Sequence, residues 1–387
     1  MRPPIKAALL LLMLVPASAT GQGIRRVSAG YGVDTTSASG WSDLSWRGAV
    51  PEIYRSWQEY LVAGRGTPEA SPHWLSAERL GLPIYDLTTV VAPNEEGLSA
   101  TVLDIRPAQV GATDEFIVKT LIGRVTGAEQ DVKPVAVLRV FALKENDRWV
   151  FANALPRLTA AWLRADVGPI SYVITPDGLF ERGRAENLVS FADSVSARFD
   201  VPRLPATIYY FANDAEELHR AMGVDWTFGR ATVGYALWQD HMLLSGSAGF
   251  ADSHQHEIVH ILLSQLEAEG RTHPIVREGV ATWLGGAEGV SFDELMKDYA
   301  DYLRGNPSIT ADNALAGPAD DRGWYPTGAA LALLVYEKGG FPLVKELYTT
   351  GTSNDELEAA MSRMLGMSWP QITARVRSRI LELAEVN

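Results

Sequence analysis

The spacing of apolar residues divides the chain into two regions with different element patterns. The first region opens with residues 51–63, where apolar side chains recur at the intervals of an amphipathic helix: Ile53, Trp57, Tyr60 and Leu61. Gly64 follows directly, as is typical of a helix end. Long runs rich in β-branched and aromatic residues then predict strands at 97–106, 113–125, 132–144 and 148–155. A helix followed by long antiparallel strands indicates an α+β domain, which we place at residues 46–165.

The second region, residues 166–387, begins with mixed strands and helices and ends in helices alone. Its pattern predicts strands at 171–175 and 207–212, a hairpin within 231–244, and helices at 185–199 and 214–222. From residue 253 onward, helical spacing predicts helices at 253–268, 275–284, 291–304, 326–338, 341–350, 354–365 and 368–385. We therefore expect an α+β chain whose second domain is a small mixed sheet followed by a mainly helical subdomain. The element order of the first region resembles the NTF2-like fold, a curved antiparallel sheet that cups a helix.

The helix predicted at 253–268 carries two histidines, His256 and His260, among apolar residues that lie nearly all around it. We expect this helix to be buried, with Asp252 or Ser253 as its N-cap. A buried polar group without a partner costs about 2 to 7 kcal/mol. Residues four positions apart lie one above the other on one helix face, so a single metal ion satisfies both imidazoles.

Residues 256–260 match the pattern H-E-x-x-H, with Glu257 beside the first histidine. Such a match arises by chance roughly once in a hundred chains of this composition. A second interpretation therefore stays open, in which two buried histidines are hydrogen-bonded to backbone or carboxylate groups and Glu257 is only favourable near a helix N-terminus. A third ligand at a suitable distance distinguishes the two interpretations.

Glu278 is the candidate third ligand, eighteen residues after His260 in the helix predicted at 275–284. Pro274 suits the first turn of that helix, and Gly285 with Gly286 suits its end. The helix is short and follows a turn, so it can pack antiparallel to the helix that carries the histidines.

These two segments resemble the gluzincin metallopeptidases, in the form found in peptidase MA-like domains. The resemblance rests on HEIVH at residues 256–260 and on Glu278 within EGVATWL, and it extends over the second region. It implies that His256, His260 and Glu278 bind Zn²⁺ and that Glu257 is the general base of a zincin-like domain.

Related zinc families are distinguished by other residues. The metzincin pattern requires glycine and histidine where this chain has Leu263 and Leu266, which excludes it. The G-x-M-E-N motif of the aminopeptidase branch is absent from the chain, so recognition of a substrate's N-terminal amine is not indicated.

Two histidines and one glutamate leave a fourth tetrahedral position for water, which is the arrangement of catalytic zinc sites. In the resembling families a tyrosine or histidine further along the chain donates to the oxyanion of the reaction. Tyr325, which opens the helix predicted at 326–338, is the candidate here. An equally simple interpretation is a tyrosine at the protein boundary with a solvated hydroxyl.

Other polar residues near the motif receive simpler interpretations. His254 is expected on the helix face opposite His256, solvated or capping. His273 precedes a proline and is expected to be a turn residue, while nothing marks His219 or His241. Thr282 lies one turn after Glu278, from where it could orient a ligand.

The hairpin predicted within 231–244 comes directly before the zinc-motif helix. It resembles the edge strand along which zincins hold an extended peptide by backbone pairing. A purely structural hairpin is the alternative.

Composition narrows the class of partner. The 387 residues carry a formal net charge of -13, which argues against nucleic-acid binding because phosphate contacts need clustered Lys and Arg. The chain has no cysteine, so disulfides, thiolate ligands and a lipid-anchored N-terminal cysteine are excluded. Only histidine and carboxylate ligands remain for a metal.

The N-terminus has the pattern of a targeting segment. Residues 1–19 combine two positive charges, a short apolar run and a final Ala17-Ser18-Ala19, as in a cleavable signal peptide. Residues 20–45 are rich in Gly, Ser and Thr and are interpreted as a flexible lead-in. The apolar run is too short to span a membrane, and no later run is long enough. We therefore expect a secreted or periplasmic protein with no membrane span after cleavage.

The sequence thus predicts an exported, zinc-dependent peptidase that acts on a peptide or protein substrate. Two alternatives remain. The first is a binding or scaffold protein of the same fold with a silent or structural zinc site, and the second is metal-assisted hydrolysis of a non-peptide bond by the same residues. The sequence leaves the particular substrate, the purpose of the first domain and the oligomeric state open.

Overall fold

The computed structural model describes residues 26–32, 48–63, 72–81, 98–109, 114–126, 131–228, 234–237, 241–247, 253–266, 272–287, 289–315 and 321–386. Within these residues the chain forms two compact units. The N-terminal unit comprises residues 26–161 and 216–228, and the C-terminal unit comprises residues 162–215 and 234–386. The proposed signal peptide at 1–19 lies outside the described residues.

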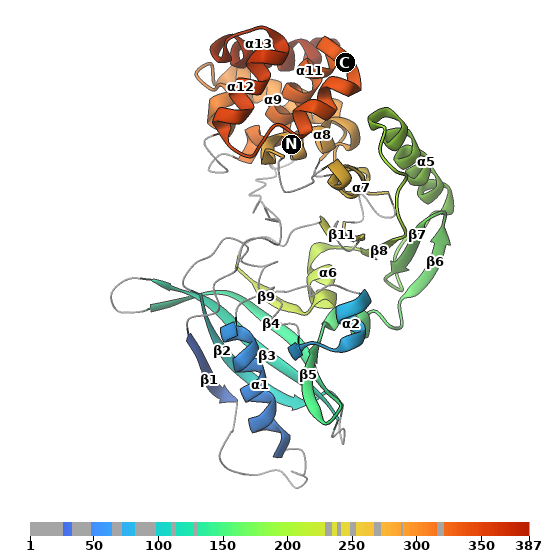
Figure 1. The fold of residues 1–387 in the computed structure, drawn as a ribbon, viewed down its shortest axis with the longest axis vertical. Coiled ribbons are helices and arrows are strands. Elements are labelled where there is room, and N and C mark those ends of the chain that lie inside the picture. The colour runs from blue at the N-terminus through green and yellow to red at the C-terminus, as the bar shows by residue number, and fades with distance from the viewer. Residues whose placement is uncertain are drawn as a thin grey trace, which may run out of the picture. The chain divides into compact units, whose positions relative to one another are not determined.

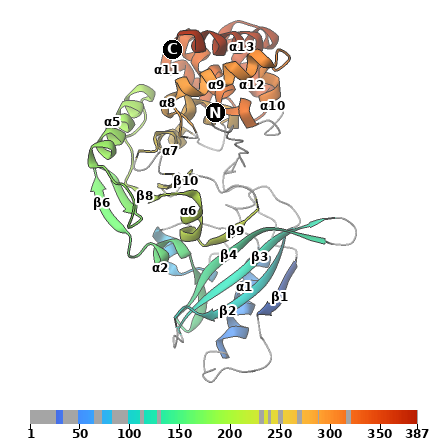
Figure 2. The same cartoon turned by 180° about the vertical axis from the view of Figure 1, so that it is seen from behind.

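The N-terminal unit is a six-stranded sheet with short helices (Figure 1). Its strands are β1 (Arg26–Gly32), β2 (Leu98–Pro107), β3 (Glu115–Thr126), β4 (Asp131–Glu145), β5 (Arg148–Ala152) and β9 (Val224–Thr227). Its helices are α1 (Val50–Ala63), α2 (Ser76–Gly81), α4 (Ala154–Leu158) and α6 (Ala215–Met222). Strands β2 to β5 are antiparallel neighbours in chain order, and β1 pairs with β2 in parallel (Figure 2).

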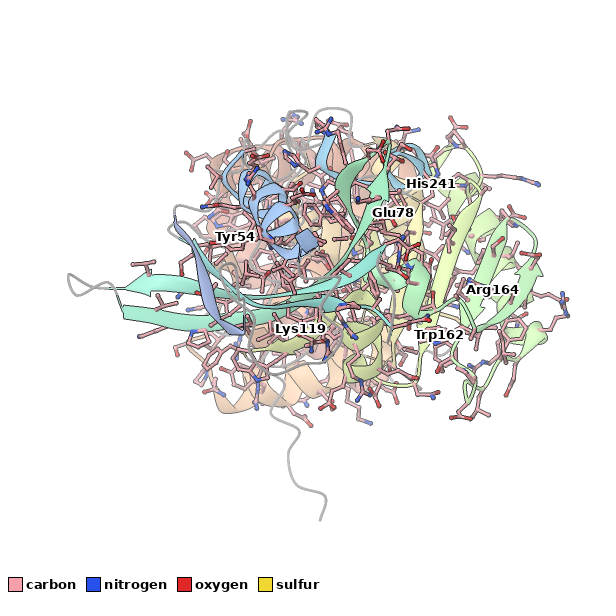
Figure 3. All side chains as sticks on the ribbon, turned by 90° about the horizontal axis from the view of Figure 1, so that it is seen from below. Tyr54, Glu78, Lys119, Trp162, Arg164 and His241 are labelled. Atoms are coloured by element: carbon pink, nitrogen blue, oxygen red, sulfur yellow. The ribbon has the colours of Figure 1, made fainter. Side chains whose placement is uncertain are left out.

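Helix α1 packs against one face of this sheet through the apolar positions that the sequence pattern predicts. Ile53, Trp57, Tyr60 and Leu61 are all buried. The indole Nε1 of Trp57 donates a 2.9 Å hydrogen bond to Thr120 on β3. Because successive side chains of a strand point to opposite faces, Lys119 lies on the other face of the sheet, away from α1 (Figure 3).

Strand β9 completes the outer edge of β4. The antiparallel partners of β5 on β4 are residues 141–145, whereas β9 pairs with residues 136–138 of the same strand. Asp225 on β9 is held by Lys119 at 2.6 Å and by Arg139 at 3.0 Å. A strand that lies beyond β8 in sequence therefore belongs to the first sheet.

The C-terminal unit contains a mixed five-stranded sheet in the order β10-β11-β8-β7-β6. Its strands are β6 (Leu163–Val167), β7 (Ile170–Ile174), β8 (Thr207–Ala212), β10 (Gly234–Leu237) and β11 (Met242–Gly246). Strands β7, β8 and β11 run parallel, and the two outer strands, β6 and β10, run antiparallel to their neighbours. Among the described residues, β10 is an edge strand.

Helices form the rest of the C-terminal unit (Figure 1). They are α5 (Arg182–Phe199), α7 (Gln255–Leu263), α8 (Pro274–Gly285), α9 (Phe292–Gly305), α10 (Ala311–Leu315), α11 (Trp324–Tyr348), α12 (Asn354–Leu365) and α13 (Trp369–Val386). Short 3-10 turns η4 (Ser264–Leu266) and η5 (Asp321–Gly323) follow α7 and precede α11. Helix α8 packs against both α7 and α11.

At the coarse level the prediction of an α+β chain with antiparallel and mixed sheets is confirmed. The predicted boundaries of α8 and α12 agree with the structure to within one residue. The two helices predicted at 326–338 and 341–350 share the label α11, and the predicted break between them is confirmed by the non-helical backbone of Gly339 and Gly340.

Several predictions were wrong in detail. Part of the expected flexible lead-in, Arg26–Gly32, is the edge strand β1, which is held by backbone pairing that its Gly- and Ser-rich sequence does not reveal. Helix α7 begins at Gln255, so neither Asp252 nor Ser253 is its N-cap. Strands β6 and β9 were not predicted.

A search of the described residues found no helix with both the length and the apolar character needed to cross a lipid bilayer.

Candidate metal centre

Helices α7 and α8 bring three predicted ligands together. His256 and His260 lie one turn apart on α7, and both side chains are almost fully buried. Glu278 lies on α8, with its side chain 20% exposed. The Nε2 atoms of the two histidines are 3.1 Å apart, and Glu278 Oε2 lies 3.2 Å from His256 Nε2 and 3.4 Å from His260 Nε2. Among the described residues, this is the group of His, Asp and Glu side chains whose donor atoms converge closely enough to hold a metal ion.

The size of this triangle fits a zinc ion. Zinc binds histidine nitrogen and carboxylate oxygen at about 2.0 to 2.2 Å with tetrahedral angles, which places neighbouring donor atoms about 3.3 to 3.5 Å apart. The three observed separations, 3.1, 3.2 and 3.4 Å, are close to that edge length. A triangle of donors leaves the fourth corner of the tetrahedron to a non-protein ligand.

His256 is oriented by a backbone carbonyl. Its Nδ1 lies 2.7 Å from the carbonyl oxygen of Gly286, at the C-terminal end of α8. A carbonyl oxygen only accepts hydrogen bonds, so Nδ1 carries the proton and Nε2 presents its lone pair to the centre of the triangle.

The electrostatics of the triangle favour a positive charge at its centre. Burial by itself raises the pKa of Glu278, but the adjacent His260 and His256 imidazoles outweigh it and hold that pKa well below its usual range. Burial by itself lowers the pKa of His256, yet the hydrogen bond and charge of Glu278 raise it overall. A divalent cation bound between the three side chains supplies such a charge.

Glu257 is not part of the ligand triangle, and its carboxylate contacts strand β10. Its side chain is 13% exposed, and its carboxylate accepts a hydrogen bond from the backbone N–H of Ala236. Burial raises the pKa of Glu257, and the nearby His260 and His256 partly offset that rise. A Cβ atom at Gly234 would lie 2.9 Å from Glu257 Oε1, so the close approach of β10 to this carboxylate requires glycine at that position.

Tyr325 lies at the start of α11 beside the ligands. Its ring centroid is 5.8 Å from that of His256, and the two rings meet edge to face. The side chain is half-buried. The hydroxyl of Tyr325 is therefore carried by a ring that is fixed against a predicted ligand.

Glycine residues allow α8 to reach its partners. A Cβ atom at Gly279, next to Glu278, would lie 2.2 Å from the carbonyl carbon of Gly328 on α11. A Cβ atom at Gly285 would lie 2.6 Å from the backbone nitrogen of His256. Helix α8 thus contacts α11 near Glu278 and α7 near His256, with backbone against backbone in both places.

The structure contradicts the prediction for His254 and confirms the one for His273. His254 was expected to be solvated or capping, but it is buried at the N-cap of α7, makes no side-chain cap hydrogen bond, and has its Nε2 3.9 Å from Glu257 Oε1. Strand β10 covers the His254 ring. Gly234 on that strand approaches so closely that a Cβ atom there would lie only 2.4 Å from the ring. His273 is the N-cap of α8 and accepts a hydrogen bond from the N–H of Ile275, so the turn interpretation is confirmed.

Thr282 does not orient a ligand by a direct hydrogen bond. It is fully buried, and its hydroxyl has no hydrogen-bond partner among the described residues. The group that does orient His256, the Gly286 carbonyl, was missed because the sequence marks Gly286 only as a helix end. Gly234 was missed as well, since nothing in the sequence indicates how closely β10 approaches α7.

Comparisons with known proteins identify no family for this chain. No protein-family model matches it, and no curated protein matches it. Among solved structures, it is similar to a mutant M1 zinc metallopeptidase from Deinococcus radiodurans bound to a Tyr-Ser-Ala substrate, with 11% sequence identity and a TM-score of 0.33. The match covers 74% of this chain and 63% of the peptidase, so this chain spans less than two thirds of that structure's length. A similarity of this degree carries no argument about activity, and the function must be argued from the site itself.

Proposed function

We propose that this protein is an exported zinc-dependent peptidase with His256, His260 and Glu278 as the zinc ligands. The observation that supports this most directly is the triangle of donor atoms, with edges of 3.1, 3.2 and 3.4 Å. Three protein ligands with a remaining corner are characteristic of catalytic zinc sites, whereas structural sites use four protein ligands.

The position of Glu257 supports catalysis rather than a purely structural role. It lies next to His256 in sequence, yet its carboxylate is not part of the ligand triangle. A structural zinc site has no use for a buried carboxylate that binds neither the metal nor a cation. A general base has to lie beside the metal without binding it.

Zinc, when bound, supplies a Lewis acid that polarises a substrate carbonyl and lowers the pKa of a water molecule to about 7. Two residues of the chain then have separate tasks, proton transfer and stabilisation of the oxyanion. Glu257 accepts the proton of the attacking water and returns it to the leaving amine. The hydroxyl of Tyr325 donates a hydrogen bond to the oxyanion that develops on the carbonyl oxygen.

The edge strand β10 supports an extended peptide as the substrate. In an antiparallel pair, alternate residues direct their N–H and C=O groups to the neighbouring strand or away from it. Ala236 donates its N–H to Glu257 and not to β11, so its backbone groups face the open edge, toward the proposed base. An extended peptide that pairs with this edge would lie alongside Glu257.

The roles of the two domains and of the leader follow as parts of the same proposal. We assign the C-terminal unit, residues 162–215 and 234–386, to the zincin-like domain, and the N-terminal unit, residues 26–161 and 216–228, to an NTF2-like domain that contributes to substrate positioning. The leader pattern of residues 1–19 supports export through cleavage of a signal peptide.

The test is metal content combined with proteolysis. The full chain is purified, its zinc is measured by mass spectrometry, and a diverse peptide library is incubated with the wild type and with Glu257→Gln. We expect one zinc per chain in both proteins and cleavage by the wild type alone. A wild-type chain that binds no zinc contradicts the metal site, and a zinc-loaded chain that cleaves nothing indicates a binding or scaffold protein instead.

A further inference from the structure

We propose that Gly286 is the positioning residue for His256, acting through its main-chain carbonyl. The inference deepens the proposed function, because it rests on His256 being a metal ligand. Gly286 is the C-terminal cap of α8, the helix that carries Glu278. The proposal gives this cap a second role, the orientation of His256 at the same metal centre. One helix would then supply one ligand by its side chain and orient another by its backbone.

The contact between these residues leaves a single tautomer for the imidazole. His256 Nδ1 is 2.7 Å from the Gly286 oxygen, and the side chain is only 6% exposed, so bulk water does not compete. An imidazole that donates from Nδ1 has its lone pair on Nε2, the atom that faces His260 and Glu278. Hydrogen bonds of this type hold metal-ligating histidines in the required tautomer and ring orientation.

The backbone at Gly286 is fixed and requires glycine. Its φ of 75° and ψ of -172° lie in a region that is accessible essentially to glycine alone. A Cβ atom there would lie 2.3 Å from the carbonyl oxygen of Val290. The N–H of Gly286 donates to the carbonyl oxygen of Thr282, which holds the preceding peptide group. The N–H of Ala287, in the same peptide group as the Gly286 carbonyl, donates to the carbonyl oxygen of Val290 at 3.1 Å, so this group is held on one side while its carbonyl faces His256 on the other.

The two histidines of the centre differ in this respect. The Nδ1 atom of His260 is buried and has no hydrogen-bond partner among the described residues. Gly286 therefore orients one of the two imidazoles, and it is the one whose backbone Gly285 also contacts closely. We expect His256 to be fixed in its ligating tautomer before metal binds.

The main test compares the zinc affinities of two glycine variants. Gly286→Ala moves the carbonyl from His256. Gly340→Ala, in the break of α11, is the matched control, because Gly340 has nearly the same backbone angles (φ 69°, ψ -166°) and a Cβ atom there meets only Pro342, at 3.6 Å. Zinc affinity is measured by competition with a chromophoric chelator. We expect Gly286→Ala to weaken zinc binding about 10- to 100-fold and Gly340→Ala to leave it unchanged. Equal affinities for the two variants overturn the proposal.

A second measurement needs no variant and applies even when Gly286→Ala fails to fold. The metal-free wild type is labelled with ¹⁵N, and the imidazole tautomers are recorded by NMR at alkaline pH, where histidines are neutral. We expect a single Nδ1–H tautomer for His256 with a slowly exchanging proton. A His256 in the Nε2–H form, or in exchange between both forms, overturns the proposal.

The outcomes separate this inference from the proposed peptidase function. The affinity and the tautomer are read without any substrate, so a chain that binds zinc but cleaves no peptide still tests the role of Gly286. Loss of peptide cleavage with unchanged zinc affinity in Gly286→Ala would count against this inference and leave the peptidase proposal intact.

Discussion

Gly279 on α8 and Gly328 on α11 meet backbone to backbone, and neither position has room for a side chain. A Cβ atom on Gly279 would lie 2.2 Å from the carbonyl carbon of Gly328, and one on Gly328 would lie 2.4 Å from the carbonyl oxygen of Ile275. Glu278 directly precedes the first glycine, and Tyr325 lies one turn before the second. This contact therefore sets the distance between the helix of the third ligand and the helix of the proposed oxyanion donor.

Alanine at either glycine of this contact should destabilise the protein. Because the opposing atoms are backbone and cannot turn aside, Gly279→Ala and Gly328→Ala should each cost about 1 to 3 kcal/mol of unfolding free energy. Urea denaturation measures the cost. Gly183→Ala in α5, where a Cβ atom meets nothing within 4 Å, is the control and should be neutral or slightly stabilising. Equal stabilities for all three variants would show that the helices separate freely.

Zinc should raise the thermal stability of the wild type. A ligand that binds only the folded state at a hundred times its dissociation constant stabilises by about 2.7 kcal/mol. Differential scanning calorimetry should therefore show a higher Tm with zinc, reversed by a chelator. His260→Ala should abolish the shift, and His241→Ala, at an exposed residue outside the site, should keep it. A shift that persists in His260→Ala would place the metal elsewhere.

Removing the hydroxyl of Tyr325 should slow peptide hydrolysis without releasing zinc. Tyr325→Phe keeps the ring that packs against His256 at 5.8 Å, so the site's packing is preserved. Loss of one oxyanion donor typically lowers kcat about 10²- to 10³-fold. Steady-state kinetics with zinc-loaded protein give kcat and KM separately. An unchanged kcat would assign Tyr325 to packing alone.

A side chain at Gly234 should disturb the proposed base more than the metal ligands. In Gly234→Ala the new Cβ atom would lie 2.4 Å from the ring of His254 and 2.9 Å from Glu257 Oε1. We expect β10 to shift from α7 and kcat to fall, while the zinc content stays at the wild-type level. Zinc analysis and peptide cleavage on the same preparation are the measurements. Full activity in this variant would contradict a role for β10 in holding Glu257.

The burial of His219 predicts a loss of stability in acid. Burial lowers the pKa of His219 to about 4, against an ordinary value of 6.5. Below 6.5 the unfolded chain takes up a proton that the folded protein refuses until about pH 4, so stability falls as the pH drops through this window. Above 6.5 both states are neutral and His219 contributes no pH dependence. The slope from this residue is at most about 1.4 kcal/mol per pH unit.

Urea denaturation from pH 7 to pH 4 measures that slope, and His219→Gln should reduce it relative to the wild type. Other histidines also contribute to the acid dependence, so the difference between the two proteins is the relevant quantity. Identical slopes would show that the folded protein protonates His219 as readily as the unfolded chain does.

Helix boundaries were predictable where the signals lie within a few residues. Helix α12 begins after Ser353, whose capping box with Glu356 is complete, and it ends at Gly366 with a left-handed backbone. Strand β9 had no such signal, because its partner residues on β4 are far away in sequence. Local patterns record local hydrogen bonds, and they do not reveal which distant strand needs a partner.

The candidate site divides in the same way. The proximity of His256 and His260 was predictable from helix geometry. The place of Glu278 beside them was predictable because a short helix that follows a turn can pack antiparallel to the helix of the histidines. The roles of Gly286 and Gly234 were not predictable. Each depends on how closely its backbone approaches a side chain of α7, and these segments meet only in the folded protein. His254 was expected to be solvated or capping, and its burial was missed for the same reason, since strand β10 covers it rather than its own helix.

The pairing of β9 with β4 affects how the protein is made on the ribosome. The outer edge of β4 at residues 136–138 receives its partner only after residues 146–223 have been synthesised. Until then the nascent chain carries an uncovered strand edge, a feature that other chains can pair with and aggregate upon. Translation speed and chaperones acting on this interval should therefore influence the yield of correctly folded protein.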